Sequence, residues 1–280
     1  MRYLEPASID EALAILASED DARCVAGGAT LVAMMNADLL SPGLLIGLRG
    51  IKELQGISEN DSGLRIGAMT THETIANSTL FRSGLELIPR AARQIAHPPV
   101  RRMGTIGGSI SHADPAADFP TALVATNASI EISSTKGSRL VAAKEFFLGY
   151  YETATAEDEI VSAIVLPHGP AAAKGDHVKV NRVDGDYATV SVSLVLEMQN
   201  HLCSYARIAV GAVAATSLHL DEADAALSGT ALTEEDISRA AALLVEAADP
   251  IDDMRGSADY RRKLIPRLLA RAVANLASEA

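Results

Sequence analysis

The chain has 280 residues, 48% of them hydrophobic and 21% charged, a composition typical of a folded globular protein. At about 150 residues per domain, this length predicts roughly two domains. The 36 acidic and 24 basic side chains give a formal charge of −12, which argues against nucleic acid or an anionic membrane as the main partner.

The first 55 or so residues are predicted to alternate between helices and strands. Ser8–Glu11 has the sequence of a capping box, and apolar residues at helical spacing follow it, so we expect a helix that ends near Ser18. A short strand is expected at Cys24–Ala26, and it leads through two glycines into a helix over Leu31–Met35. A buried strand at Leu44–Ile46 completes this unit.

The middle of the chain predicts further strands and helices around one long loop. A strand is expected at Leu64–Ile66, a helix start at Thr71–Glu73, and a helix from Pro89 to Ala96, since proline is tolerated in a first turn. His97–Asp118 is rich in proline and glycine and is predicted to be irregular. Structured loops of this length are usually functional. A helix, two strands and a helix should follow, and then a strand at Glu159–Leu166.

The best candidate linker is His168–Asp176, with two glycines, a proline and an alanine run. Three strands and then three helices are predicted after it, an order typical of an α+β domain. The strands are expected at Val178–Asn181, Thr189–Met198 and Tyr205–Val213, and the helices at about 221–228, 233–247 and 258–277. The predicted domains are residues 1–171, with subdomains at about 1–55 and 56–171, and residues 176–280.

Several classes of site and location are disfavoured. Cys24 and Cys203 are too few for a disulfide framework, a four-cysteine zinc site or an all-cysteine iron–sulfur cluster. The histidines lack metal-ligand spacing. No apolar run approaches about 18 residues, and Met1–Asp10 lacks the basic start and apolar stretch of a signal peptide. We expect a cytoplasmic protein with no membrane span and no metal of its own.

Two glycine-rich loops are the strongest candidates for a binding site. Ala26–Thr30 (Ala-Gly-Gly-Ala-Thr) lies between a predicted strand and a predicted helix, and Gly104–Ser109 (Gly-Thr-Ile-Gly-Gly-Ser) lies inside the long loop. Paired glycines permit positive φ and close approach to a ligand, and successive amides form an anion-binding nest. Each loop alone is also consistent with an ordinary tight turn. Together, two such nests suit a ligand with two adjacent phosphates.

The loops do not match the common nucleotide motifs. No Gly-Lys-Ser/Thr follows either one, as a Walker A sequence requires. Neither has the Gly-x-Gly-x-x-Gly spacing of a Rossmann nicotinamide site. Asp118, just beyond the second loop, is interpreted either as a ligand for a ribose hydroxyl or as a helix N-cap.

The last predicted helix carries basic residues that form either a solvated face or a docking surface for an acidic partner: Arg261, Arg262, Lys263, Arg267 and Arg271.

These segments, in this order, resemble the FAD-binding medium subunit of the molybdenum hydroxylases, the family of carbon monoxide dehydrogenase and xanthine dehydrogenase. The resemblance extends over nearly the whole chain. It is carried by the opening Tyr3–Ser8, the Ala26–Thr30 loop, Ile66–Thr71, Val100–Ser109 with its Thr-Ile-Gly-Gly, Asp114–Pro120 and Glu159–Pro167. It implies an α+β fold with a two-subdomain FAD-binding unit like that of vanillyl-alcohol oxidase, followed by a small domain with a three-stranded antiparallel sheet and helices.

The resemblance also implies which residues bind FAD. The diphosphate would be wrapped on one side by Val25, Ala26, Gly27, Gly28, Ala29, Thr30, Leu31 and Val32, and on the other by Thr105, Ile106, Gly107, Gly108 and Ser109. Relatives often have histidine where this chain has Ala29. The further FAD contacts implied are Ile95 as an apolar contact, Asp118 beside the second loop, the backbone of Ile160 or Val161 against adenine, Lys179 towards the flavin, and Tyr187 over part of its ring.

By the same resemblance, this chain is an oxidoreductase subunit that carries FAD and has no catalytic residue of its own. A large molybdopterin-binding subunit would oxidise the substrate, and a small subunit with two-iron-two-sulfur clusters would pass electrons to FAD and on to an external acceptor. His112 and Tyr187 are hypothesised to tune flavin protonation. The alternatives are a stand-alone flavin oxidase of the same fold and a non-catalytic scaffold subunit.

Overall fold

The computed structural model describes residues 1–278. The N-terminal part is a three-stranded parallel sheet in the order β1-β3-β2, formed by Arg2–Leu4, Leu44–Gly47 and Ala22–Val25. Helix α1 (Ile9–Ser18) packs on it through Ala12 and Leu13, and its N-cap Ser8 accepts a hydrogen bond from the Glu11 amide, as predicted. The short helix α2 (Leu31–Asn36) has no buried residue.

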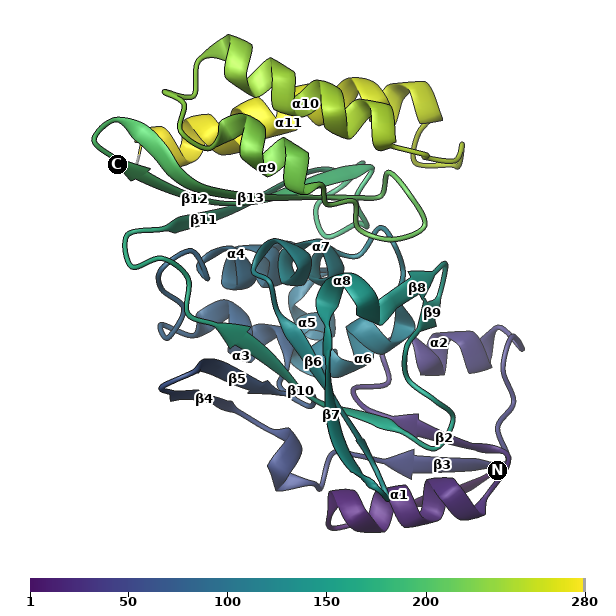
Figure 1. Cartoon of the computed structure of the whole chain (residues 1–280). Helices are drawn as coiled ribbons and strands as arrows, with labels where there is room; N and C mark the ends of the chain where they lie inside the picture. Colours follow the sequence, from purple (N-terminus) through teal and green to yellow (C-terminus); the bar gives the residue numbers. More distant parts are fainter. Residues whose placement is uncertain (279–280) are drawn as a thin grey trace.

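The central part is a five-stranded antiparallel sheet in the order β4-β5-β10-β6-β7. Its strands are Ile57–Asn60, Gly63–Gly67, Ile160–Pro167, Ser129–Ser134 and Gly137–Ala142. Six helices lie between this sheet and the C-terminal part (Figure 1), and all of them except α5 contribute residues to the largest core cluster. They are α3 (His72–Asn77), α4 (Leu87–Gln94), α5 (Pro98–Met103), α6 (Ile106–His112), α7 (Asp118–Ala125) and α8 (Ala143–Phe146). The small elements η1 (Lys52–Leu54), β8 (Phe147–Gly149) and β9 (Glu152–Thr153) complete this part.

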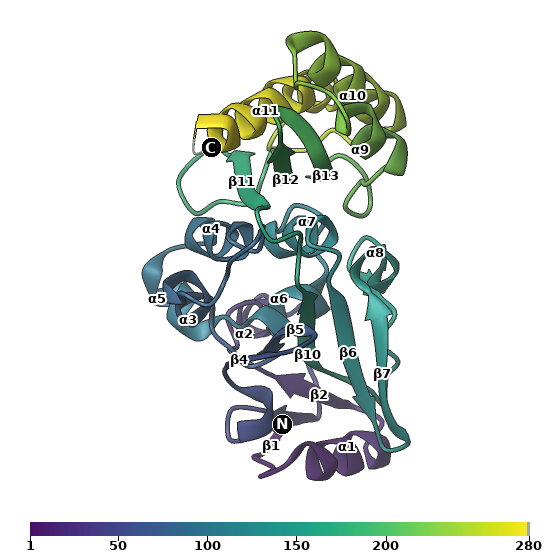
Figure 2. The same ribbon diagram turned by 60° about the vertical axis from the view of Figure 1, so that its left-hand side comes forward.

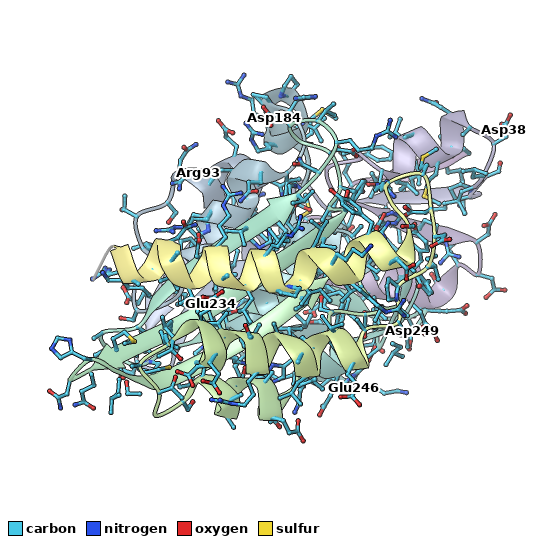
Figure 3. The ribbon with its side chains drawn as sticks, turned by 90° about the horizontal axis from the view of Figure 1, so that it is seen from above. Asp38, Arg93, Asp184, Glu234, Glu246 and Asp249 are labelled. Carbon is cyan, nitrogen blue, oxygen red and sulfur yellow. The ribbon has the colours of Figure 1, made fainter. Side chains whose placement is uncertain are left out.

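The C-terminal part is a three-stranded antiparallel sheet in the order β11-β12-β13, formed by Lys174–Val180, Val190–Gln199 and Leu202–Gly211. One face carries α9 (Asp221–Leu227), α10 (Glu234–Ala247) and α11 (Ala258–Ser278), and the other rests on α4 and α7 (Figure 2). Figure 3 shows α10 and α11 side by side across this sheet. In the central strand β12, serine alternates with valine and leucine over Val190–Leu194, and the residues of both faces are buried there.

The predicted α+β architecture and its three-stranded antiparallel C-terminal sheet are confirmed. The prediction of an irregular segment over His97–Asp118 is wrong. Pro98 and Pro99 occupy the first positions of α5, where the missing N–H costs nothing, and the paired glycines of the second loop lie inside α6. The predicted linker is also too long at its end, because Lys174–Asp176 pairs with Leu194–Leu196 in the sheet.

Over the residues that the structure describes, no helix combines the length and the apolar character needed to cross a membrane. The predicted basic face of α11 is only partly correct. Lys263, Arg267 and Arg271 are exposed, whereas Arg261 is buried. Its guanidinium donates hydrogen bonds to the carbonyl oxygens of Thr189 and Ala212, so it holds the helix to the sheet.

Candidate cofactor site

A cavity of about 630 Å³ lies where the N-terminal sheet, the helices of the central part and the loop between β11 and β12 come together. Its volume is in the range expected for a cofactor site. Both glycine-rich loops line it, although they are separated by about 75 residues in the sequence. The wall also includes residues of β2, β10 and the segment before α7.

The first loop presents free backbone amides to the cavity. Gly28 has a φ of +76°, which glycine adopts without strain. Gly27 has no positive φ, and glycine is required there for a different reason: a Cβ at this position would overlap the Met103 carbonyl oxygen. Among the described residues, the amides over 27–31 donate to no backbone acceptor. They are therefore available to an anionic ligand.

The second loop is built differently. Thr105 is the N-cap of α6, and its Oγ1 accepts a hydrogen bond from the Gly108 amide. The amides of Ile106 and Gly107 donate to the carbonyl oxygens of Thr70 and Ala68. Neither Gly107 nor Gly108 uses the positive φ that glycine permits. This loop therefore offers a ligand its hydroxyl groups and the close approach that glycine allows, more than a row of free amides.

The two loops form one continuous floor. A Cβ at Gly108 would lie 3.5 Å from the Cβ of Ala26, and Gly27 packs directly on the backbone at Met103 and Gly104. The absence of side chains at these glycines therefore lets the two loops pack against each other beside the same cavity. A pyrophosphate bridge fits this cradle, because five free amides on one side and the hydroxyls of Thr105 and Ser109 on the other are the donors that phosphate oxygens accept from.

The two ends of the cavity differ in chemistry. One end is bounded by aliphatic residues of the N-terminal core, including Leu16, Leu48 and Ile160. Cys24 also lies here, and burial raises the pKa of its thiol to about 12, so it is protonated at neutral pH. The other end carries the aromatic rings of His72, His112 and Tyr187, which line the wall there. A ligand with two different flat ring systems would find a distinct environment at each end.

Asp118 is the centre of a buried charged network at the aromatic end. Its Oδ1 lies 2.9 Å from Nε2 of His177, and its Oδ2 accepts a hydrogen bond of 2.9 Å from Nζ of Lys179. Burial alone would raise the pKa of Asp118, but the hydrogen bond from His177 and the charge of Lys179 hold it below its ordinary value. The N-cap interpretation is wrong: Ala117 is the N-cap residue of α7, and Asp118 is its first residue.

Lys179 and His177 link the network to its surroundings. The ammonium group of Lys179 also donates to the carbonyl oxygens of Gln94 and Asp186. Nδ1 of His177 lies 2.8 Å from Oγ of Ser193. Since an ionised carboxylate only accepts, Nε2 of His177 carries the proton, and the serine hydroxyl can donate to Nδ1. The network therefore ties β11 and β12 to α4 and α7 beside the cavity.

Most residues predicted to bind the ligand line this one cavity. Those that do are Ala26, Gly27, Gly28, Ala29, Thr30, Leu31, Ile95, Thr105, Gly107, Gly108, Ser109, Asp118, Ile160, Val161 and Tyr187. Val25, Val32, Ile106 and Lys179 do not. Ile106 is fully buried in the central core. Lys179 contacts the wall through Asp118 and Asp186.

His72 is a wall residue that sequence reasoning missed. It begins α3, its ring lies 5.4 Å from that of Phe119, and a Cβ at Gly104 would lie 2.7 Å from its Nε2. Its buried Nδ1 has no hydrogen-bond partner among the described residues. The helix start at Thr71 was predicted, but its position beside Gly104 depends on contacts that no local pattern reveals.

We expect His72 to make folding stability depend on pH. Burial lowers its pKa to about 4, against an ordinary value of 6.5. As the pH falls from about 6.5 to about 4, the unfolded chain binds the proton first, so the free energy of unfolding decreases, by roughly 3 kcal/mol at most. Urea unfolding of the parent and of His72→Gln at pH 7 and pH 5 would measure this. An equal loss of stability in both proteins would contradict the assignment.

The cavity has the size and the hydrogen-bond donors that a dinucleotide cofactor requires. Two family models match the chain. The FAD binding domain in molybdopterin dehydrogenase matches residues 1–169, and the CO dehydrogenase flavoprotein C-terminal domain matches residues 178–276. The chain belongs to this family of FAD-binding medium subunits of molybdenum hydroxylases. It is an FAD-dependent oxidoreductase subunit, as the resemblance implied.

Relatives match over almost the full length. The nicotine 6-hydroxylase medium subunit of Paenarthrobacter nicotinovorans is 34% identical, with 98% of this chain and 96% of the relative covered. The carbon monoxide dehydrogenase medium chain of Afipia carboxidovorans is 38% identical, with 97% and 94% covered. Among solved structures, the Cu,Mo-CO dehydrogenase has a chain that superposes with a TM-score of 0.96 at 37% identity, covering 100% of this chain and 98% of that one. Quinoline 2-oxidoreductase from Pseudomonas putida 86 gives 0.94 at 34% identity, with the same coverage.

Proposed function

We propose that this chain carries electrons within a larger oxidoreductase: its FAD receives them from two-iron-two-sulfur clusters of a small partner subunit and passes them to an external acceptor. A large molybdopterin-binding subunit would oxidise the substrate. The main support is that relatives matching the chain end to end are named as medium chains or medium subunits of such enzymes. FAD suits this role because it can exchange electrons singly or in pairs; the protein supplies binding, orientation and electrostatics.

We propose a specific placement of FAD in the cavity. The pyrophosphate would lie between the free amides over 27–31 and the hydroxyls of Thr105 and Ser109. Adenine would occupy the aliphatic end near Ile160 and Val161, and the isoalloxazine ring the aromatic end beside Tyr187. Supporting this direction, both charged residues of the buried pair, Asp118 and Lys179, lie at the aromatic end, where they can influence the electron affinity of a flavin.

Two side chains at the aromatic end are proposed to influence flavin protonation. Burial lowers the pKa of His112, with Asp114 opposing, and its ring lies 5.1 Å from that of Tyr151. Burial raises the pKa of Tyr187 to about 12. Both groups are therefore neutral near pH 7, and they would act as hydrogen-bonding groups rather than as charges.

We also propose that the chain divides into two domains between β10 and β11.

Co-purification tests the proposed role most directly. The chain, tagged in its native host and isolated under mild conditions, is expected to bring two partner chains with it, together with flavin, iron and molybdenum. Absorbance and metal analysis of the complex measure all three. A flavin-loaded chain without molybdenum or iron that oxidises an alcohol and makes peroxide would instead indicate a stand-alone oxidase. A complex that contains molybdenum and iron but no flavin would indicate a scaffold.

A further inference from the structure

The loop between α10 and α11 reaches the aromatic end of the cavity from outside the wall. The guanidinium carbon of Arg255, in this loop, lies 5.2 Å from the centroid of the Tyr187 ring. This is within the distance at which a cation attracts the face of an aromatic ring. Tyr187 lines the cavity, whereas Arg255 does not. The arginine therefore contacts this wall ring without lining the cavity itself.

Arg255 is held in place by hydrogen bonding to Asp253, which is itself bound to the buried Arg261. Oδ1 of Asp253 accepts hydrogen bonds from the amides of Arg255, at 2.7 Å, and Gly256, at 3.2 Å, and it also accepts one from the guanidinium of Arg261. Arg261 is only 3% exposed and is fixed to two strand-end carbonyl groups. Thr189 adds a hydrogen bond from its hydroxyl to the carbonyl oxygen of Arg255. The loop is thus anchored to the C-terminal sheet.

The ring of Tyr187 has little else to fix it. Its backbone is held, because its amide donates to Oδ1 of Asp186 and the next amide, that of Ala188, donates to the carbonyl oxygen of Ala116. The ring packs against Ala116, Ala188 and Ala212, whose side chains are single methyl groups. Over the described part of the chain, its hydroxyl group has no hydrogen-bond partner. The stacked guanidinium is therefore the main directional contact on this ring.

We propose that Arg255 is a positioning residue that holds the ring of Tyr187 against the flavin end of the cofactor cavity. This inference rests on the proposed placement of the isoalloxazine ring beside Tyr187. Asp253 and Arg261 fix the position of Arg255. Arg255 then fixes the orientation of the Tyr187 ring, which would contact the flavin. Folding of the C-terminal part thereby fixes one wall of a site whose phosphate cradle belongs entirely to the N-terminal and central parts.

Flavin fluorescence of the FAD-loaded full chain tests this chain of contacts, because a tyrosine ring in contact with a flavin quenches it. We expect Tyr187→Leu to raise the fluorescence per bound flavin several-fold. Arg255→Gln should raise it roughly twofold or more, and Arg255→Lys, which keeps a cation near the ring, should restore most of the quenching. In the Tyr187→Leu background, Arg255→Gln should have no further effect. The matched control is Arg182→Gln, which loses a contact to the same loop, at Met254, but no ring contact.

The outcomes separate this inference from the proposed placement of FAD. Two results would show that Arg255 does not position the ring. In the first, Tyr187→Leu raises the fluorescence and Arg255→Gln does not. In the second, Arg255→Gln raises the fluorescence by the same factor whether or not Tyr187 is present. If Tyr187→Leu itself leaves the fluorescence unchanged, the flavin does not lie beside Tyr187, and both proposals fail. Thermal unfolding of every variant identifies any that change fluorescence through loss of folding, since such variants would also lose bound FAD.

Discussion

Replacing Gly27 with alanine is expected to abolish FAD retention. The added Cβ would overlap the carbonyl oxygen of Met103, and a backbone carbonyl cannot move aside as a flexible side chain would. The first loop would have to separate from the second, so its free amides and the hydroxyls opposite would no longer face the same pyrophosphate. The flavin-to-protein ratio of the purified chain and the Kd for added FAD measure the effect, which we expect to be at least about 100-fold in Kd, or roughly 3 kcal/mol.

Gly50→Ala is the matched control for this change. Gly50 also lies in the N-terminal part and has no positive φ, but the nearest atom to an added Cβ, the Pro6 carbonyl oxygen, would be 3.6 Å away, an ordinary contact. FAD binding should therefore survive in Gly50→Ala. Normal flavin content in Gly27→Ala would show that the loops need not touch for FAD to bind.

The same reasoning ranks substitutions in the second loop. Gly107→Val should block FAD binding, because a Cβ there would lie 2.6 Å from the Cβ of Ala68 and would push α6 away from the central sheet. Gly108→Val should block it through the larger side chain, which would extend towards Ala26 and fill the cradle, since the Cβ alone is 3.5 Å from that residue. Gly108→Ala, by contrast, should keep part of the affinity. Unaltered flavin content in both valine variants would exclude the cradle as the phosphate site.

Local sequence patterns predicted helices and strands well where the residue type concerned occurs in only one structural context. Ser8 before an amphipathic run marked the start of α1, and strand alternation marked the C-terminal sheet. These patterns gave wrong predictions where a residue type occurs in two different structural contexts. Prolines that break a helix interior also begin helices, as Pro98 does, and glycines that mark turns also permit close packing inside a helix, as Gly107 does against Ala68. Tertiary packing determines which of the two structural roles a given proline or glycine has.

The residues that line the cavity were largely predictable, but the contacts among the buried polar residues beside it were not. The glycine pairs carry a motif that can be read locally, and the resemblance added most of the remaining wall. The partners of Asp118 could not be read in this way, because His177 and Lys179 are 59 and 61 residues away in the sequence. The pairing of β11 with β12 and the packing of α7 on that sheet bring them together. A contact made by two elements that far apart leaves no spacing for a sequence pattern to detect.

Asp118→Ala is expected to be the most destabilising single substitution in the chain's polar network. It would leave the ammonium group of Lys179, whose side chain is 2% exposed, without its counter-charge, and His177 without its acceptor. Removing one partner of a buried ion pair typically costs about 3–5 kcal/mol. We therefore expect the free energy of unfolding, measured in urea at pH 7, to fall by that amount. Asp118→Asn keeps an acceptor and should lose less.

Asp221→Ala is a closely matched control, because Asp221 is also the first residue of a helix and also lies near a histidine, at 3.1 Å from Nε2 of His219. Its side chain is 83% exposed, so its removal should cost less than about 1 kcal/mol. A loss in Asp118→Ala no larger than this would mean that Lys179 is solvated or neutral in the folded chain. The double variant Asp118→Ala/Lys179→Met separates the cost of the unpaired Lys179 charge from the cost of the acceptor that His177 loses. We expect it to recover part of the stability, because burying an apolar side chain of similar length costs less free energy than burying an unpaired ammonium group.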